Sequence, residues 1–200
     1  MNINEAIQNR RAIKLYDPSV KISDDDFKKL MELTILAPTS FNIQHWRFVR
    51  VTDKAKREQI RAVAWGQAQV TDASELVIIC ADLKAWAKNP RRYSNGAPED
   101  VQNYLEKALT DFYTGREWIE RDEAMRSVGM AAQTLMLAAQ GMGYDSGPMI
   151  GFDQDAVAKI INLPSDHVIG MFVVIGKRTA DAHPRIGRLP VDQVVINNSF

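Results

Sequence analysis

The sequence has little of the chemistry on which many small proteins depend. It holds one cysteine, Cys80, in 200 residues, so no disulfide can form within the chain and a reducing compartment is expected. Lysine plus arginine (25) balance aspartate plus glutamate (25), so no net charge draws the chain toward nucleic acid or a membrane surface. No apolar run approaches the ~20 residues of a spanning helix, and no apolar export segment follows Arg10 and Arg11. We expect a cytoplasmic protein with neither nucleic acid nor membrane as a partner.

The motifs of common catalytic centres are also missing. His45, His167 and His183 lie far apart in the sequence and lack metal-ligand spacing, so no metal site is predicted. There is no Gly-x-Gly-x-x-Gly, P-loop or nucleophile elbow, and the acidic residues are too scattered to single out a catalytic pair. Cys80 lies inside an apolar run and is interpreted as a small buried hydrophobe. With no catalytic side chain predicted, an enzyme of this sequence would take its chemistry from a cofactor.

What remains is the pattern of one domain in which helices and strands alternate. A chain of this length with 46% hydrophobic residues can bury a full core. Asn2 with Glu5, Ser23 with Asp26, and Asp153 are placed to begin helices. Periodicity predicts further helices over 54–64, 101–112 and 125–139, and strands over 46–51, 76–81 and 168–175. The apolar run at 76–81 has the length of a central strand covered on both faces.

The stretch from Ala37 to Trp46 is the first candidate site, since it joins a helix to a strand. It combines the hydrogen-bonding side chains of Thr39, Ser40, Asn42 and Gln44 with two aromatic residues, Phe41 and Trp46. Loops on a rigid scaffold often carry binding residues, and amides beside aromatic rings suit a planar polar ligand. The alternative is a polar turn that caps the following strand.

Three other segments could contribute to the same site. The basic run Arg10 to Lys14 could clamp a phosphate, although most short basic runs are solvated turns. Glycines flanking apolar residues in Gly147–Asp153 would let the backbone approach a flat ligand, or the segment is a plain connector. The tail from Ala180 adds Arg185 and Arg188 and has an apolar edge that suits packing on a partner subunit.

Taken in order, these segments resemble the motifs of the FMN-dependent nitroreductase family. Arg10-Arg11-Ala12-Ile13-Lys14 resembles the opening motif, and Pro38-Thr39-Ser40-Phe41-Asn42-Ile43-Gln44-His45-Trp46 the second. Gly147-Pro148-Met149-Ile150-Gly151-Phe152-Asp153 resembles the third, and Arg188-Leu189-Pro190 the fourth. Their order and spacing match over essentially the whole chain. The sequence is most similar to the small bacterial NAD(P)H nitroreductases and quinone reductases.

The resemblance implies an α+β fold over residues 1–200, with a mixed central sheet flanked by helices, in an intertwined homodimer with FMN at the subunit interface. Arg10, Arg11, Ala12, Lys14, Arg185 and Arg188 would hold the flavin phosphate and pyrimidine side. Gln67 and Gln69 would contact the pyrimidine edge, and Pro148, Met149, Ile150 and Gly151 would lie along the ring. Pro38, Thr39, Ser40, Asn42 and Gln44 would come from the other subunit.

The implied reaction is a ping-pong hydride transfer through flavin N5, in which NAD(P)H is the first substrate and a quinone or nitroaromatic compound the second. Lys14 would give electrostatic support to the reduced flavin, and Phe41, Tyr113 and Trp118 would line the substrate channel. Core packing is an equal alternative for Tyr113 and Trp118. The sequence departs from the family pattern at Ala12, His45 and Gln69, and in the wider spacing of Arg185 and Arg188.

Two other functions remain open at this point. The same FMN-binding residues could serve an oxidase, dehydrogenase or reductive dehalogenase-like enzyme that acts on one metabolite. A non-enzymatic flavin-binding dimer is the third possibility. The sequence does not identify the electron acceptor or the preferred pyridine nucleotide.

Overall fold

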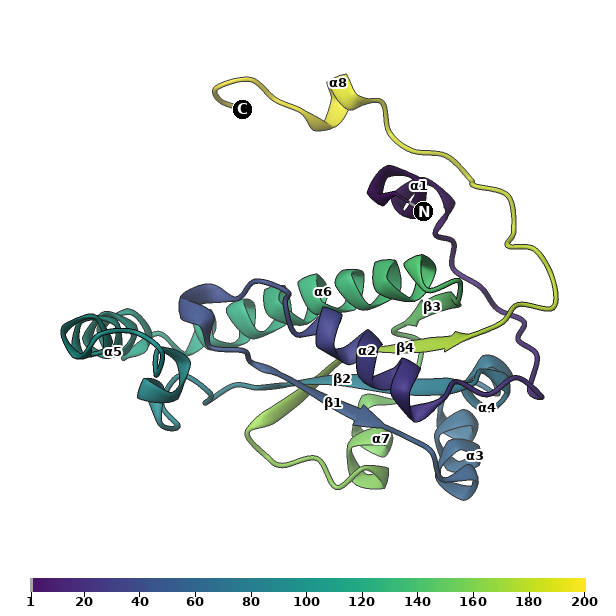
Figure 1. The fold of residues 1–200 in the computed structure, drawn as a ribbon, viewed down its shortest axis with the longest axis horizontal. Helices are drawn as coiled ribbons and strands as arrows, with labels where there is room; N and C mark the ends of the chain where they lie inside the picture. The colour runs from purple at the N-terminus through teal and green to yellow at the C-terminus, as the bar shows by residue number, and fades with distance from the viewer. Residues whose placement is uncertain (1) are drawn as a thin grey trace.

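A computed structural model describes residues 2–200, which form a four-stranded sheet covered by helices on both faces (Figure 1). The strands are β1 (Trp46–Arg50), β2 (Glu75–Asp82), β3 (Asp145–Met149) and β4 (His167–Gly176), in the order β1-β2-β4-β3. The helices are α1 (Ile3–Asn9), α2 (Asp24–Thr34), α3 (Lys54–Val63), α4 (Gln69–Asp72), α5 (Glu99–Tyr113), α6 (Glu117–Gly141), α7 (Gln154–Ile160) and α8 (Val191–Val194). Two short 3-10 helices, η1 (Ser40–Asn42) and η2 (Pro90–Tyr93), complete the fold, and its α+β class is the predicted one.

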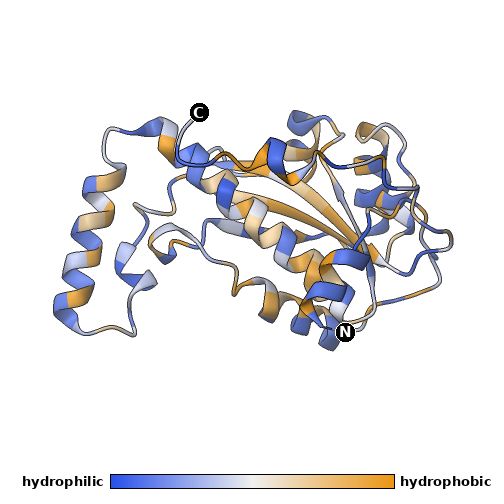
Figure 2. Ribbon diagram, turned by 90° about the horizontal axis from the view of Figure 1, so that it is seen from above, coloured by the Kyte–Doolittle hydropathy of each residue, from blue (hydrophilic) through white to orange (hydrophobic). Residues whose placement is uncertain are grey.

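The continuous apolar run of β2 is explained by a core on each of its faces. All eight residues of the strand are buried. Leu76, Ile78 and Cys80 belong to a cluster that includes residues of α3 and α7, whereas Val77 and Ile79 belong to one formed with α2 and α6. Because successive strand residues point to opposite faces, a strand covered on both sides needs apolar residues at every position. Figure 2 shows these central strands as a hydrophobic layer between the helices.

The predicted helix starts are confirmed by their capping bonds. The side chain of Asn2 accepts from the backbone N–H of Glu5 at 3.0 Å, and the Glu5 carboxylate accepts from that of Asn2 at 2.9 Å. Ser23 caps α2 and Asp153 caps α7, each by accepting a backbone N–H three residues on. These side chains satisfy donors that have no partner within the helix.

The sheet differs from the expected mixed sheet in its strand directions. All three strand pairs are antiparallel, and within residues 2–200 the one parallel pairing is an isolated bridge between Ala12 and Ser146. The segment Asp145–Met149, expected to be a turn-rich connector, pairs with β4 as the edge strand β3. Glycine and proline have low strand propensity, so the local sequence does not predict a strand here. Pairing with β4 stabilises it instead.

The ends of the molecule contrast with its central layers. The tail after β4 runs away from the sheet and passes α1 (Figure 1), and it exposes apolar side chains, among them Leu189, Val191 and Phe200. Helix α5 lies beyond the end of the sheet in both views (Figure 2). No helix in the described part of the chain combines the length and apolar character needed to cross a membrane. The exposed tail is a surface that a partner could cover.

Candidate functional site

The tail returns to the N-terminal segment and completes a cluster of arginines. Arg185 Nη2 donates to the backbone oxygen of Gln8 at 2.7 Å, and Arg11 Nη2 donates to that of His183. Burial lowers the pKa of Arg10, and the nearby charges of Arg185, Arg188 and Arg11 lower it further. Like charges gathered in this way are unfavourable unless an anion joins them.

The arginine cluster has unused capacity to bind an anion. Among residues 2–200, no carboxylate lies within 4.0 Å of the charged nitrogens of Arg10, Arg11, Lys14, Arg185 or Arg188. The Nη1 of Arg10 is buried and has no hydrogen-bond partner in the described chain. A buried donor without a partner is costly. The phosphate of a nucleotide-like cofactor would supply both the missing charge and the missing acceptor.

Strand β3 holds the basic segment in place at very short range. The backbone N–H of Ile13 donates to the oxygen of Ser146 at 3.1 Å, and Ala12 forms the bridge to the same residue. A Cβ on Gly147 would lie 2.6 Å from the backbone oxygen of Ile13, so glycine is required for this approach. The first and third sequence motifs therefore meet in the structure.

Two glutamines join this region, Gln67 from the connection between α3 and α4 and Gln69 from the start of α4. Gln67 Nε2 donates to the backbone oxygen of Gly151 at 2.9 Å, and Gln69 Nε2 donates to Gln67 Oε1 at 3.0 Å. Ile150, directly before Gly151 in the chain, is 73% exposed. The structure thus brings the predicted amides beside the predicted ring-contacting segment, with Pro148 half-buried and Met149 turned into the core.

Trp65 is a candidate site residue that the sequence analysis missed. Its indole lies against Gly151, where an added Cβ would meet the ring at 2.4 Å, yet 77% of the side chain is exposed. Its backbone φ is +56°, a left-handed conformation that is rare for a bulky residue. The signal available in the sequence was its position directly before Gly66 and Gln67. An exposed, strained aromatic residue beside the glutamines is placed to contact a planar ligand.

The loop that carries the second motif, Pro38–Trp46, also contains residues with left-handed backbone conformations. Phe41, Asn42 and Gln44 have φ values of +50°, +55° and +54°. Gln44 is held by Thr39 Oγ1, which accepts its backbone N–H at 3.0 Å, while Asn42 Nδ2 donates to the oxygen of Tyr93 at 2.9 Å. Three left-handed non-glycine residues in four positions cost energy, and such strain is concentrated at functional sites.

The structure does not bring this loop to the arginine cluster within one chain. The loop is held to the middle of α6, where His45 contacts Ser127, whereas β3 follows the end of that helix (Figure 1). Ser127 lies 14 residues before Gly141, the last residue of α6, which corresponds to about 21 Å at 1.5 Å per residue. Pro38, Thr39, Ser40, Asn42 and Gln44 are thus separated from the other predicted cofactor residues of their own subunit.

The three aromatic residues predicted to contact substrate differ in their surroundings. Phe41 is half-buried and packs against Phe112, with ring centroids 5.5 Å apart. Tyr113 is fully buried and stacks on Trp86 with ring centroids 5.5 Å apart, which favours the alternative of core packing over a place in the substrate channel. Trp118, at the start of α6, is 66% exposed. The apolar stripe of α5 explains Tyr113, because the same spacing serves core packing.

His45, a departure from the family pattern, anchors the loop to α6. The side chain is completely buried, and Nδ1 lies 3.0 Å from the Ser127 hydroxyl, which is buried as well. Nε2 has no hydrogen-bond partner within the described residues. Burial lowers the pKa of His45 to about 4, with the Asp82 charge opposing the shift and that of Arg47 adding to it. The imidazole is therefore neutral near pH 7.

We expect His45 to make the stability of the FMN-free protein depend on pH. An unfolded histidine has a pKa near 6.5, so between about pH 6.5 and 4 the unfolded chain binds a proton that the folded chain does not. The free energy of unfolding should therefore fall as the pH falls, by about 2 kcal/mol from this residue between pH 7 and pH 5. Urea unfolding at both pH values should show that contribution lost in His45→Gln. The exposed His183→Gln is the control, and an equal slope in both variants would contradict the assignment.

A second polar cluster lies where β2 ends and β4 begins. Asp82, Asp166 and His167 place one ligand atom each within 4.8 Å of one another, a grouping that the sequence spacing did not reveal. The Lys88 ammonium lies 2.9 Å from Asp82 and 2.6 Å from Asp166. Lys88 therefore supplies the positive charge that a metal ion would otherwise give to these two carboxylates. Asp166 has its pKa lowered to about 2, first by the hydrogen bond from Lys88. We interpret the cluster as an ion-pair network in which Lys88, in the segment after β2, is bound to Asp82 and Asp166.

Comparison with known proteins supports the sequence resemblance. The model of the nitroreductase family matches residues 7–177. "Protein DrgA" of Synechocystis is 48% identical over 200 residues, which cover 98% of this chain and 95% of that protein. "Putative NAD(P)H nitroreductase MhqN" of Bacillus subtilis is 32% identical, with 94% and 95% covered.

Solved structures agree in fold over nearly the whole chain. The Bacillus subtilis structure described as "putative nitroreductase ydfN" has a TM-score of 0.91 at 30% identity, covering 96% of this chain and 97% of that one. A structure from Exiguobacterium sibiricum, described as a "putative nitroreductase in complex with FMN", has a TM-score of 0.90 at 27% identity, with 98% and 97% covered. These similarities extend over both the sheet and the exposed tail.

Proposed function

Because the chain belongs to the nitroreductase family, we propose that it is an FMN-dependent oxidoreductase that takes electrons from NADH or NADPH and reduces quinone or nitroaromatic compounds. Relatives named as NAD(P)H nitroreductases and the FMN-bound structure from Exiguobacterium sibiricum support the cofactor and the reaction class. The observation that carries the proposal is the arginine cluster, with the unpartnered Arg10 Nη1 inside it.

In the proposed complex, each group of residues has a distinct task. Arg10, Arg11, Arg185 and Arg188 bind the phosphate of FMN. Lys14, exposed in the same basic segment, is the cation that offsets negative charge near the pyrimidine. Gln67 and Gln69 present amides at the pyrimidine edge, and Ile150 and Gly151 support one face of the ring. Bound FMN supplies the hydride chemistry, so the protein contributes position, charge and exclusion of water.

The separation of the two site groups supports a shared site in a homodimer. The tail exposes Ile186, Leu189, Val191, Val195 and Phe200. Apolar side chains in such number are an interaction surface rather than scattered exceptions. In a twofold dimer the same surface is buried twice, and the loop of each subunit can reach the arginine cluster of the other. We propose that Asn42 and Gln44 complete the partner's flavin site in this way.

An absorption experiment tests the proposed reaction. The purified protein, reconstituted with FMN, should show flavin bands that bleach when NADPH or NADH is added without oxygen. Addition of menadione, a quinone, should restore the oxidised spectrum, because the reduced enzyme then has an acceptor. Retention of flavin without bleaching by either nucleotide would contradict the reductase assignment and favour oxidation of a metabolite. Failure to bind FMN would contradict the cofactor assignment itself.

A further inference from the structure

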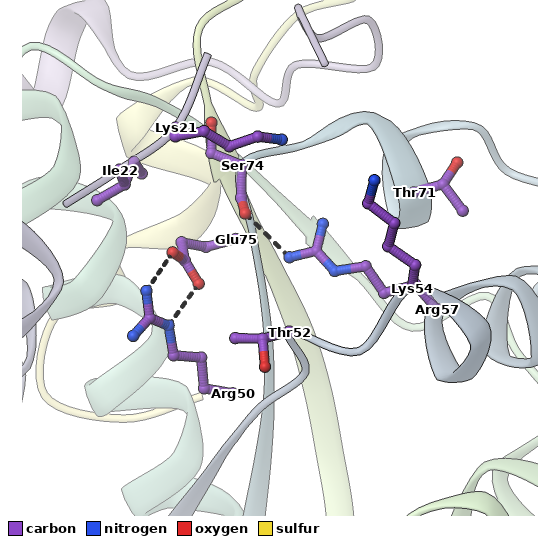
Figure 3. Close-up of a pocket in the computed structure, with 9 residues that line it drawn as sticks. All are labelled: Lys21, Ile22, Arg50, Thr52, Lys54, Arg57, Thr71, Ser74 and Glu75. Carbon is purple, nitrogen blue, oxygen red and sulfur yellow. Dashed lines mark hydrogen bonds and ion pairs between the residues drawn. The ribbon is translucent and has the colours of Figure 1, made fainter. Parts of the chain in front are cut away.

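A hollow of about 270 Å³ lies between the end of the N-terminal segment, α3 and α4, apart from the residues assigned to flavin (Figure 3). Its lining includes four cationic side chains, Lys21, Arg50, Lys54 and Arg57, against the single carboxylate of Glu75. The volume is near the lower end of small-molecule pockets, so its occupant would be small. None of these residues belongs to the four sequence motifs.

The carboxylate of Glu75 is fully committed to one of the cations. Arg50 Nε and Nη2 donate to its two oxygens at 2.8 and 2.7 Å, and Arg50 Nη1 pairs with Asp24 at 2.7 Å. These bonds engage both oxygens of Glu75 with Arg50. Within the described residues, the ion pair of Glu75 is with Arg50, and Lys21, Lys54 and Arg57 make no direct ion pair with it.

Arg57 is a buried cation without a counter-ion. It is 7% exposed and donates to the backbone oxygens of Val51, Ala73 and Ser74. Burial lowers the pKa of Arg57, while the charge of Glu75 opposes this shift and that of Arg50 adds to it. Within residues 2–200, no carboxylate lies at ion-pair distance from it. A buried charge is normally paired, so this one favours an anion in the hollow.

Two lysines approach the same space from different elements. Figure 3 shows the ammonium ends of Lys21 and Lys54 turned toward the hollow on either side of the Arg57 guanidinium. Lys54 begins α3 and has no ion pair in the described chain, and Lys21 donates to the backbone oxygen of Pro18 at 2.9 Å. The same three cations, Lys21, Lys54 and Arg57, also line an adjoining hollow. Its other charged residues are Arg61, Glu58 and Asp72.

We propose that this hollow binds a phosphate-type oxyanion, either free phosphate or the phosphate group of a small metabolite. Three cations that converge from three directions suit a tetrahedral group, whose oxygens also point in several directions. A planar carboxylate would be served better by one bidentate arginine, and Arg50 is already used in that way by Glu75. The site is independent of the flavin, because it shares no residue with the cofactor assignment.

Titration calorimetry with inorganic phosphate tests the proposal on the full-length protein saturated with FMN. Saturation fills the flavin phosphate position, and sodium chloride holds the ionic strength constant. We expect saturable binding at one phosphate per subunit, weakened by about tenfold or more in Lys54→Ala and in Lys21→Ala, because each removes a charged donor. Both lysines are exposed, so the variants should fold.

Lys56→Ala is the matched control, since this exposed lysine lies on α3 outside the hollow. Equal weakening in Lys56→Ala would indicate nonspecific attraction and overturn the proposal, as would the absence of saturable binding. Glycerol 3-phosphate and glycerol provide the second arm of the experiment. Tighter binding of glycerol 3-phosphate than of phosphate identifies a phosphorylated metabolite as the ligand class. Equal binding of the two, with none of glycerol, identifies free phosphate.

Discussion

Replacing Arg188 with alanine should weaken FMN binding by about 10- to 100-fold, the range set by one charge-assisted hydrogen bond of about 1.5–3 kcal/mol. Arg188 is exposed and makes no ion pair with the described residues, so its loss removes nothing from the core. Its charge acts on Arg10 together with that of Arg185, which places it among the groups that would share the phosphate. Quenching of flavin fluorescence on titration with FMN measures the change in affinity.

The control is Arg121→Ala, which removes an exposed arginine from α6, away from the cluster. It should bind FMN like the wild-type protein, and both variants should keep the same circular dichroism spectrum and thermal transition. Wild-type affinity in Arg188→Ala would show that the phosphate assignment is wrong. Equal losses in both variants would point to a general effect of net charge instead.

Two defective chains should restore activity when they are expressed together. One chain carries Arg188→Ala, and the other carries Asn42→Gly with Gln44→Gly, where glycine keeps the left-handed backbone of the loop. If each site combines the arginines of one subunit with the loop of the other, the mixed dimer has one intact site and one with both defects. Such a dimer should show about half the wild-type activity per dimer, since a twofold dimer has two equivalent sites.

Different affinity tags on the two chains allow the mixed dimer to be purified in two steps and its flavin content to be measured. The homodimer of each variant, prepared in parallel, is the control and should remain nearly inactive. A site built within one subunit gives the opposite result, because both sites of the mixed dimer would then be damaged. Absence of recovery would therefore exclude the shared site while leaving the arginine assignment to its own test.

Local sequence signals predicted most elements of the fold because their causes are local. The caps at Asn2, Ser23 and Asp153 bond within three residues, and the run at 76–81 reports burial on both faces. Strand β3 was missed because its Gly-Pro sequence is unsuited to an isolated strand, and only its pairing with β4 stabilises it. The antiparallel directions likewise depend on long connections that periodicity does not describe.

Some residues of the candidate site were likewise predictable from the sequence, and others become apparent only in the folded structure. Motif order identified residues that meet around β3, such as Ile13, Gly147 and Gly151. It did not identify Trp65, whose left-handed backbone and contact with Gly151 arise only in the fold. Tyr113 was placed in the channel although it is buried, because an apolar stripe on a helix has the same spacing in both cases.

The loop contacts α6 at Ser127, and about 21 Å of helix separates that residue from Gly141, close to β3 and the basic segment. A site shared between two subunits would make FMN affinity depend on the concentration of the protein. If the complete site exists only in the dimer, FMN binds the dimer and not the separated subunits. Flavin and subunit association then stabilise each other, so each added FMN shifts the equilibrium toward dimers. Dilution below the dimer dissociation constant should release flavin and subunits together. Cellular FMN supply would in this way control how much of the chain is assembled.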